Sequence, residues 1–93
     1  MAKVIQAELH PNADKLLVLT VDVGSVQKQI VAGIRLHYQP EELIGKFVVV
    51  VDNLEPATIR GVVSNGMILA AGDQEKLCLV TPERPISLGS QVR

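Results

Sequence analysis

Branched aliphatic side chains constrain this fold most, because Val occurs 14 times and Ile 7 times among 93 residues. Both side chains branch at Cβ, which restricts their rotamers in a helix and suits the pleated surface of a strand. Gly occurs 7 times and Pro 5 times, mostly between the apolar runs. This pattern predicts an all-β barrel or sandwich, and the length predicts a single domain over residues 1–93.

The first half of the chain predicts a three-stranded meander and one helix. The helix is expected at 38–45, because Pro lies near its first position, acidic residues fill its first turn and Gly ends it. Alternating apolar residues and intervening turn residues place the strands before it. These strands are expected at residues 2–9, 16–23 and 26–34.

The second half is expected to complete a barrel. The apolar run 46–52 (KFVVVVD) is typical of a strand buried on both faces. Residues 58–63 fit a strand or irregular structure, and Asn65-Gly66 is a hairpin signal that predicts a turn into 67–71. A last short strand is expected at 77–81. Five strands with one short helix between the third and fourth have the order of an OB-fold barrel, here with a C-terminal β extension.

Composition and charge restrict the class of partner. Tyr38 and Phe47 are the only aromatic residues, so stacking of single-stranded bases is not expected. The net charge of −1 argues against strong non-specific binding to a duplex. The charge is uneven, however, because residues 39–56 carry a net −3 and each flanking segment carries +1. A locally basic face could therefore form from Lys3, Lys15, Lys28, Arg35 and Arg60.

No arrangement of reactive side chains predicts an enzyme. Cys78 lies in a Leu-Cys-Leu-Val run and is interpreted as a small buried apolar residue. His10 and Asp14 have the spacing of a helical metal pair, but the intervening Pro favours a turn. Glu41-Glu42 is interpreted as the solvated first turn of the helix. Because nucleotide-binding, zinc-protease and CxxC motifs are also absent, we expect no catalytic residue, metal or cofactor.

Targeting signals are also missing. No apolar run approaches the roughly 20 residues that span a bilayer, and the start MAKVIQAE lacks the features of a signal peptide. One Cys and no N-x-S/T site argue against a disulfide-linked secreted scaffold. We therefore expect a cytoplasmic protein with no membrane partner.

Polar donors gather between Asn53 and Ala71. Arg60-Gly61 and the Ser64–Met67 segment combine hydrogen-bond donors with flexible backbone. An Arg fork suits a phosphate, Ser and Asn suit sugar or phosphate oxygens, and Gly lets a ligand approach the backbone. The alternative is a Gly-containing hairpin in which Met67 fills the end of the barrel.

Seven short motifs span nearly the whole chain: HPNADKL (10–16), VDVG (21–24), QIVAGI (29–34), YQPEELIGK (38–46), NL (53–54), RGVVSNGM (60–67) and LAA (69–71). In order and spacing they resemble the tRNA-binding OB domain at the C-terminus of many methionyl-tRNA synthetases. Similar domains occur in free-standing tRNA-binding proteins, in the endothelial monocyte-activating polypeptide, in yeast tRNA-synthetase cofactors and in phenylalanyl-tRNA synthetase β chains.

The resemblance implies an OB fold that binds tRNA by its shape rather than by its anticodon sequence, usually as a homodimer. It also implies a non-catalytic appendage that acts with the catalytic body of the synthetase in cis. We expect the C-terminal segment from about Leu77 to contribute to the dimer contact. The RNA face is implied to contain Asn53, Arg60, Ser64 and Met67, with Arg35 and Lys46 as further candidates.

Two departures from the family pattern modify these expectations. The family places basic residues after Asn-Leu, whereas Glu55 follows here and no Lys or Arg precedes Arg60. Weak binding, about micromolar or poorer, with a shallow salt dependence is therefore expected. The family's opening phrase before Lys3-Val4 is absent, which suggests a trimmed start, whereas the tail from Pro85 to Arg93 resembles a natural synthetase end. Together these features favour a C-terminal synthetase fragment over a free-standing protein.

Two alternatives remain open beside tRNA binding. One is a dimerisation module whose RNA binding has decayed, which Glu55 and the net negative charge would favour. The other is the related secretion-chaperone branch, which binds unfolded polypeptide. That branch lacks the Arg-Gly…Ser-x-Gly-Met phrase, so the presence of this phrase counts against it.

Overall fold

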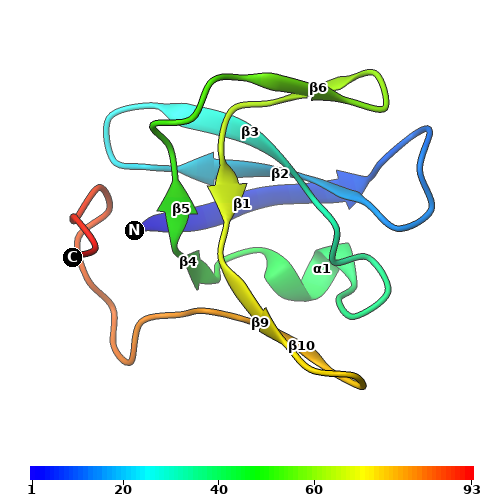
Figure 1. Cartoon of the computed structure of the whole chain (residues 1–93). Coiled ribbons are helices and arrows are strands. Elements are labelled where there is room, and N and C mark those ends of the chain that lie inside the picture. The colour runs from blue at the N-terminus through cyan, green and yellow to red at the C-terminus, as the bar shows by residue number, and fades with distance from the viewer.

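A computed structural model describes all residues from Met1 to Arg93 (Figure 1). The first part contains β1 (Ala2–Leu9), β2 (Leu17–Asp22), β3 (Gln27–Ala32), the helix α1 (Pro40–Leu43) and β4 (Phe47–Val48). The four strands form an antiparallel sheet in the order β3-β2-β1-β4, curled into half a barrel. No helix is long and apolar enough to cross a membrane. The prediction of an all-β fold with one short helix is confirmed.

Six further strands form pairs. They are β5 (Val50–Val51), β6 (Ala57–Ile59), β7 (Val62–Ser64), β8 (Met67–Ile68), β9 (Ala70–Gly72) and β10 (Leu77–Leu79). β5 pairs with β8, whereas β6–β7 and β9–β10 are hairpins. The two hairpins project from opposite sides of the barrel, β6–β7 at the top and β9–β10 at the bottom of Figure 1.

The apolar run after the helix belongs to two sheets in turn. β4 pairs with β1, and two residues later β5 pairs with β8. At the junction, the Val49 carbonyl accepts a hydrogen bond from Leu69 N–H at 3.0 Å. The prediction of one strand over 46–52 covered on both faces holds only at Val48 and Val49, which are consecutive and both buried. Phe47, Val50 and Val51 are half-buried, and the run is divided into two short strands.

Three hydrogen bonds close the barrel between β3 and residues 63–65. Val31 N–H donates to Ser64 Oγ at 3.0 Å, and Asn65 N–H donates to the Gln29 carbonyl at 2.8 Å. The Gln29 side chain donates to the Val63 carbonyl at 2.8 Å. Because residues 63–65 lead into β8, which pairs with β5, these bonds complete the circuit around the barrel.

A small apolar core fills this barrel. Leu17, Leu19 and Val21 alternate along β2 and are fully buried, as the two-residue period of a strand requires. Only 16 of the 93 residues are buried, so the stability of the fold depends on few side chains. The central cluster contains Ala2, Val4, Leu17, Leu19, Val21, Ile30, Ala32, Ile34, Leu43, Val48 and Ile68.

The hairpin expected at Asn65-Gly66 lies instead at Arg60-Gly61. β6 and β7 pair in the register Ile59↔Val62, which leaves these two residues as the loop. β7 and β8 do not pair with each other. The backbone N–H of Asn65 is used to close the barrel, so this segment connects two sheets and cannot form a local hairpin.

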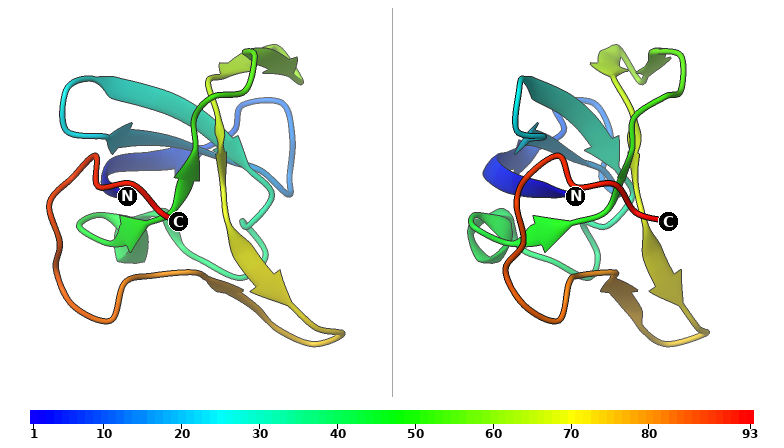
Figure 2. Two further views of the ribbon diagram at one scale, coloured as in Figure 1. Left: turned by 60° about the vertical axis from the view of Figure 1, so that its left-hand side comes forward. Right: turned by 90° about the vertical axis from the view of Figure 1, so that its left-hand side faces the viewer.

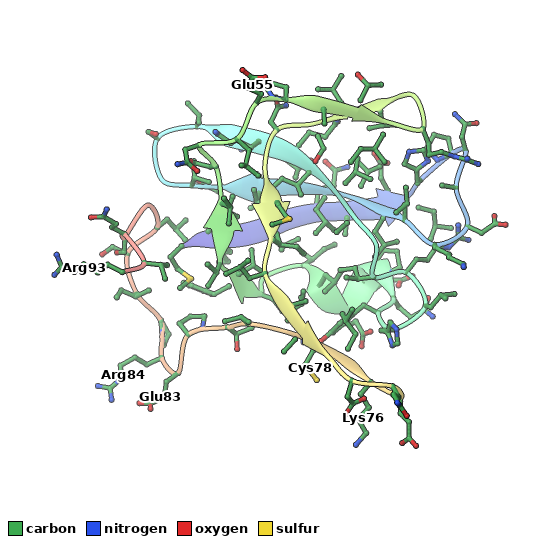
Figure 3. The ribbon with its side chains drawn as sticks, in the orientation of Figure 1. Glu55, Lys76, Cys78, Glu83, Arg84 and Arg93 are labelled. Carbon is green, nitrogen blue, oxygen red and sulfur yellow. The ribbon has the colours of Figure 1, made fainter.

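The β9–β10 hairpin exposes Cys78, contrary to the prediction that this residue is buried. Leu77 and Leu79 pack against the core, so the alternation of a strand turns the residue between them outward. Figure 3 shows Cys78 at the surface of this hairpin.

The turn of this hairpin depends on one carboxylate. Asp73 Oδ1 accepts hydrogen bonds from Glu75 N–H at 2.8 Å and from Lys76 N–H at 2.7 Å. Both bonds favour the charged carboxylate and hold the pKa of Asp73 below its usual value.

The β9–β10 hairpin constitutes the predicted β extension, because no strand follows Leu79. The remaining segment passes around the molecule and returns to the N-terminus (Figure 2). There Gly89 N–H donates to the Met1 carbonyl at 2.9 Å, and the Met1 ammonium donates to the Ser90 carbonyl at 2.9 Å. Hydrogen bonds therefore join the N-terminal and C-terminal segments.

Candidate nucleic-acid interface

Arg60 occupies the tip of the β6–β7 hairpin. Arg60 (φ +53°) and Gly61 (φ +89°) both have left-handed backbones, as a two-residue loop that matches the twist of its strands requires. Arg60 is the only residue other than Gly with a positive φ, a conformation that costs roughly 1–2 kcal/mol. Its exposed guanidinium donates through Nη2 to the Asn12 carbonyl at 3.3 Å. A cationic fork is thus held at an exposed tip.

The loop between β1 and β2 brings a second arginine to the same region. Arg35 Nη1 lies 3.5 Å from the Ala13 carbonyl. Ala13 directly follows Asn12, whose carbonyl accepts from Arg60. Arg35 N–H also bonds to the Lys15 carbonyl at 3.4 Å. The structure therefore gathers Arg35, Arg60 and Lys15 around one loop, which also carries Asp14. Such a cluster can contact phosphate oxygens.

The rest of the predicted basic face is dispersed. Lys28 pairs with Asp52 at 3.5 Å, which offsets its charge. Lys3 lies over the Phe47 ring, with 6.0 Å between Nζ and the ring centroid. Two of the five cations therefore have local partners, and only the charge of Lys28 is offset by a carboxylate.

Lys46, a predicted site residue, lies apart from the arginine cluster. It lies three residues after the end of α1, and its N–H bonds to the Leu43 carbonyl at 3.0 Å. Its Nζ lies 5.6 Å from the centroid of the Tyr38 ring. With Lys3 over Phe47, a lysine thus covers each of the two aromatic rings.

Ser64 is buried in the wall of the barrel and lines a groove between β3, β8 and the β6–β7 hairpin. Its exposed fraction is 2%. Its hydroxyl accepts from Val31 N–H at 3.0 Å and donates to the Gly66 carbonyl at 3.0 Å. The hydroxyl therefore substitutes for a backbone partner that β3 lacks at this point. Contact of Ser64 with RNA stays a prediction.

Replacing Ser64 with Ala is expected to reduce the free energy of unfolding by about 1–3 kcal/mol, because the buried Val31 N–H loses its acceptor. Urea denaturation followed by circular dichroism measures this loss, and hydrogen exchange of the Val31 amide should accelerate. The matched control is Ser25→Ala, which removes a hydroxyl from an exposed turn. Equal stability of the two variants would contradict a role of Ser64 in closing the barrel.

Asn53 and Met67 lie on the β5–β8 side of the hairpin. Asn53 is exposed two residues beyond β5, and Met67 pairs with Val51 and is 49% exposed. Met67 therefore does not fill the end of the barrel. It lines an apolar groove of about 530 Å³ between β3, β8 and the β6–β7 hairpin, which Leu54 and Glu55 also line. Figure 3 shows Glu55 at the start of this hairpin, pointing away from the barrel.

His10 and Asn12 contribute to the site although the sequence did not assign them a role in it. His10 is 3% exposed and lies against the hairpin through a 3.0 Å contact between Nε2 and the Ile59 carbonyl. No group of three or more His, Cys, Asp or Glu side chains that could hold a metal ion is present. The available sequence signal was the position of His10 before Pro11-Asn12 in a turn, which favours side-chain bonds to backbone.

Comparison with known proteins places this geometry in a family. The sequence profile of the tRNA binding domain family matches residues 1–91. The methionine–tRNA ligase of Nanoarchaeum equitans is 50% identical over 93 residues, which are 100% of this chain and 12% of that protein. The methionine–tRNA ligase of Thermotoga maritima is 51% identical over 92 residues, 99% of this chain and 15% of that protein. This chain thus spans only a small part of these relatives.

Solved structures agree with the sequence comparison. A MetRS-related protein from Pyrococcus horikoshii superposes with a TM-score of 0.91 at 35% identity, covering 99% of this chain and 85% of the other. The chaperone CsaA from Bacillus anthracis superposes with a TM-score of 0.88 at 29% identity, covering 99% and 86%. With a family profile over nearly its whole length and a related structure of similar size, this chain belongs to the tRNA binding domain family.

Proposed function

We propose that this chain binds folded tRNA through the tip of the β6–β7 hairpin and the adjoining β1–β2 loop. Asn53 and Met67 would extend the contact along β5 and β8. The observation that carries the proposal is the arginine fork of Arg60, held at an exposed tip by Asn12 beside Arg35. Membership of the tRNA binding domain family supports RNA as the ligand.

Recognition is proposed to act on the RNA backbone and its shape. Arg60 and Arg35 can form charge-assisted bonds to phosphate oxygens, whose spacing depends on the fold of the RNA. Stacking of bases is not expected to contribute, because Tyr38 and Phe47 are the only aromatic residues. Folded tRNA should therefore be preferred over a regular duplex.

Binding is expected to be weak, about micromolar or poorer, because few phosphates are neutralised. Glu55 is exposed at the base of the hairpin, and Lys28 is paired with Asp52. A mobility-shift titration should compare tRNA with an RNA duplex of equal charge at low and at physiological salt. Selective retention of tRNA supports the proposal, whereas equal retention of both RNAs, or of neither, would contradict it.

The proposed context is the C-terminal end of a cytoplasmic methionyl-tRNA synthetase. The methionine–tRNA ligases that match this chain are several times longer than it. Weak affinity suits an appended domain, because tethering raises the effective concentration of bound tRNA near the catalytic body. In this proposal the domain holds tRNA and the rest of the enzyme performs aminoacylation.

We also propose that the domain forms a homodimer through its C-terminal part. Beyond β10, three apolar side chains remain substantially exposed: Val80 (40%), Ile86 (50%) and Val92 (57%). Apolar residues left uncovered on a small domain favour association. Light scattering is expected to give about twice the chain mass of 10.0 kDa. A mass equal to one chain at high concentration would overturn the dimer.

A chaperone function is the second candidate, favoured by the similarity to the chaperone CsaA from Bacillus anthracis. A third is dimerisation without RNA binding. The three candidates respond differently to loss of the Arg60 guanidinium. Only tRNA binding should require it, whereas capture of an unfolded polypeptide or dimer formation should persist without it.

A further inference from the structure

His10 has a hydrogen-bond arrangement that identifies the tautomer of its neutral ring. Its ring is 3% exposed. Asn12 N–H donates to Nδ1 at 2.9 Å, so Nδ1 must carry a lone pair. In the neutral ring the hydrogen is then on Nε2, which donates to the Ile59 carbonyl at 3.0 Å. One ring atom thus holds the β1–β2 loop and the other holds the hairpin.

These contacts meet at Arg60. Ile59 is the last residue of β6 and directly precedes Arg60. Asn12 adds two contacts, because its carbonyl accepts from Arg60 Nη2 at 3.3 Å and its Nδ2 lies 3.5 Å from the Arg60 carbonyl. Residues 10–12 therefore contact the Arg60 guanidinium and the hairpin backbone on both sides of the Ile59–Arg60 bond.

The hairpin has few other attachments near its tip. Its base is held to β3 through Val63 and Ser64. β6 and β7 form a separate two-stranded sheet, and a hairpin of two strands is marginally stable by itself. Without the His10 bond, binding would have to order the tip, which lowers affinity.

We propose that His10 is a positioning residue for RNA binding that acts through its Nε2–H bond to the Ile59 carbonyl. The inference rests on the proposed function, because it names what orients the arginine that contacts RNA. His10 itself is buried and does not contact the ligand.

Two substitutions separate the two ring atoms. In His10→Gln the side-chain amide nitrogen can replace Nε2 as donor to Ile59, but the acceptor for Asn12 N–H is lost. In His10→Asn the side-chain oxygen can replace Nδ1, but the donor to Ile59 is lost. We expect the Asn variant to bind tRNA about three- to tenfold more weakly and the Gln variant to stay close to the parent protein.

A double substitution tests whether His10 acts through Arg60. With Arg60→Asn already present, His10→Asn should weaken binding little further, since the group that it positions is gone. Hydrogen exchange provides a readout without RNA. The amides of Ile59 and Val62 should exchange faster in His10→Asn than in His10→Gln, while those of Leu19 and Ile30 report whether the core stays folded.

The outcomes are distinguishable. Equal affinity of the two folded variants, or additive losses in the double variant, would overturn the positioning role. If the core amides also exchange faster in His10→Asn, that variant has lost its fold, and the hydrogen exchange and tRNA affinity of His10→Gln become the test. Faster exchange of the hairpin amides in His10→Gln would then overturn the positioning role. If the unsubstituted chain retains no tRNA, the proposed function fails, and the exchange comparison still tests whether His10 holds the hairpin.

Discussion

Replacing Gly66 with Ala is expected to lower the free energy of unfolding by about 2–6 kcal/mol, combining backbone strain with a steric clash. Gly66 has φ +144°, a conformation that residues with a Cβ rarely adopt. An added Cβ would lie 2.9 Å from the Val51 carbonyl oxygen. That atom belongs to β5, which pairs with β8, so the clash can be relieved only by separating two strands of the barrel.

A second glycine provides the matched control for this substitution. Gly45 also has a positive φ (+91°), but an added Cβ would meet nothing within 4 Å. Gly45→Ala should therefore cost only the left-handed penalty of roughly 1–2 kcal/mol. Urea denaturation followed by circular dichroism compares the two variants. Equal losses of unfolding free energy in the two variants would mean that the close approach of Gly66 to β5 adds nothing to the cost of the substitution.

Replacing Arg60 with Asn is expected to weaken tRNA binding by about 10- to 100-fold, because hydrogen bonds to charged groups contribute about 1.5–3 kcal/mol. Asn is chosen because it tolerates the left-handed backbone at this position (φ +53°), so the hairpin should keep its turn. The slope of log K against log salt should also fall by about one, corresponding to the loss of one phosphate contact. Binding titrations at several salt concentrations measure both quantities.

Arg84→Asn removes the same charge from a distant position. Arg84 lies in the C-terminal segment, 82% exposed and paired with Glu83 at 2.8 Å (Figure 3). Its loss should leave both the affinity and the salt slope of tRNA binding close to those of the parent chain. A loss of affinity as large as that of Arg60→Asn would show that net charge alone governs binding, and the proposed interface would be wrong.

The strands followed from local sequence where their residues alternate or form long apolar runs. β1, β2 and β3 lie within their predicted ranges, and the helix lies within 38–45, because Pro and Gly define its ends. The later strands were harder to predict. β5 and β8 are each two residues long and are held by partners far along the chain, so no local periodicity marks their ends.

The predicted site residues lie in different environments in the structure. Arg60 lies at a hairpin tip beside Arg35, whereas the Ser64 hydroxyl is buried and Lys46 lies beside Tyr38. Contact of these residues with RNA stays a prediction. The hairpin signal at Asn65-Gly66 was misleading, because Arg60-Gly61 forms the loop instead. Gly66 has a positive φ where β8 approaches β5, so its role is one of close packing rather than of a hairpin turn.

The sequence by itself determined the fold class and the membership of a family, because these depend on residue periodicity and on the order of short motifs. Only the tertiary structure decided which polar groups remain available to a ligand. The sequence does not show whether a serine hydroxyl faces solvent or bonds to a backbone amide. The Ser64 hydroxyl accepts a hydrogen bond from the amide of Val31, 33 residues away. His10 likewise acquires its role from Ile59, 49 residues away, when the barrel folds.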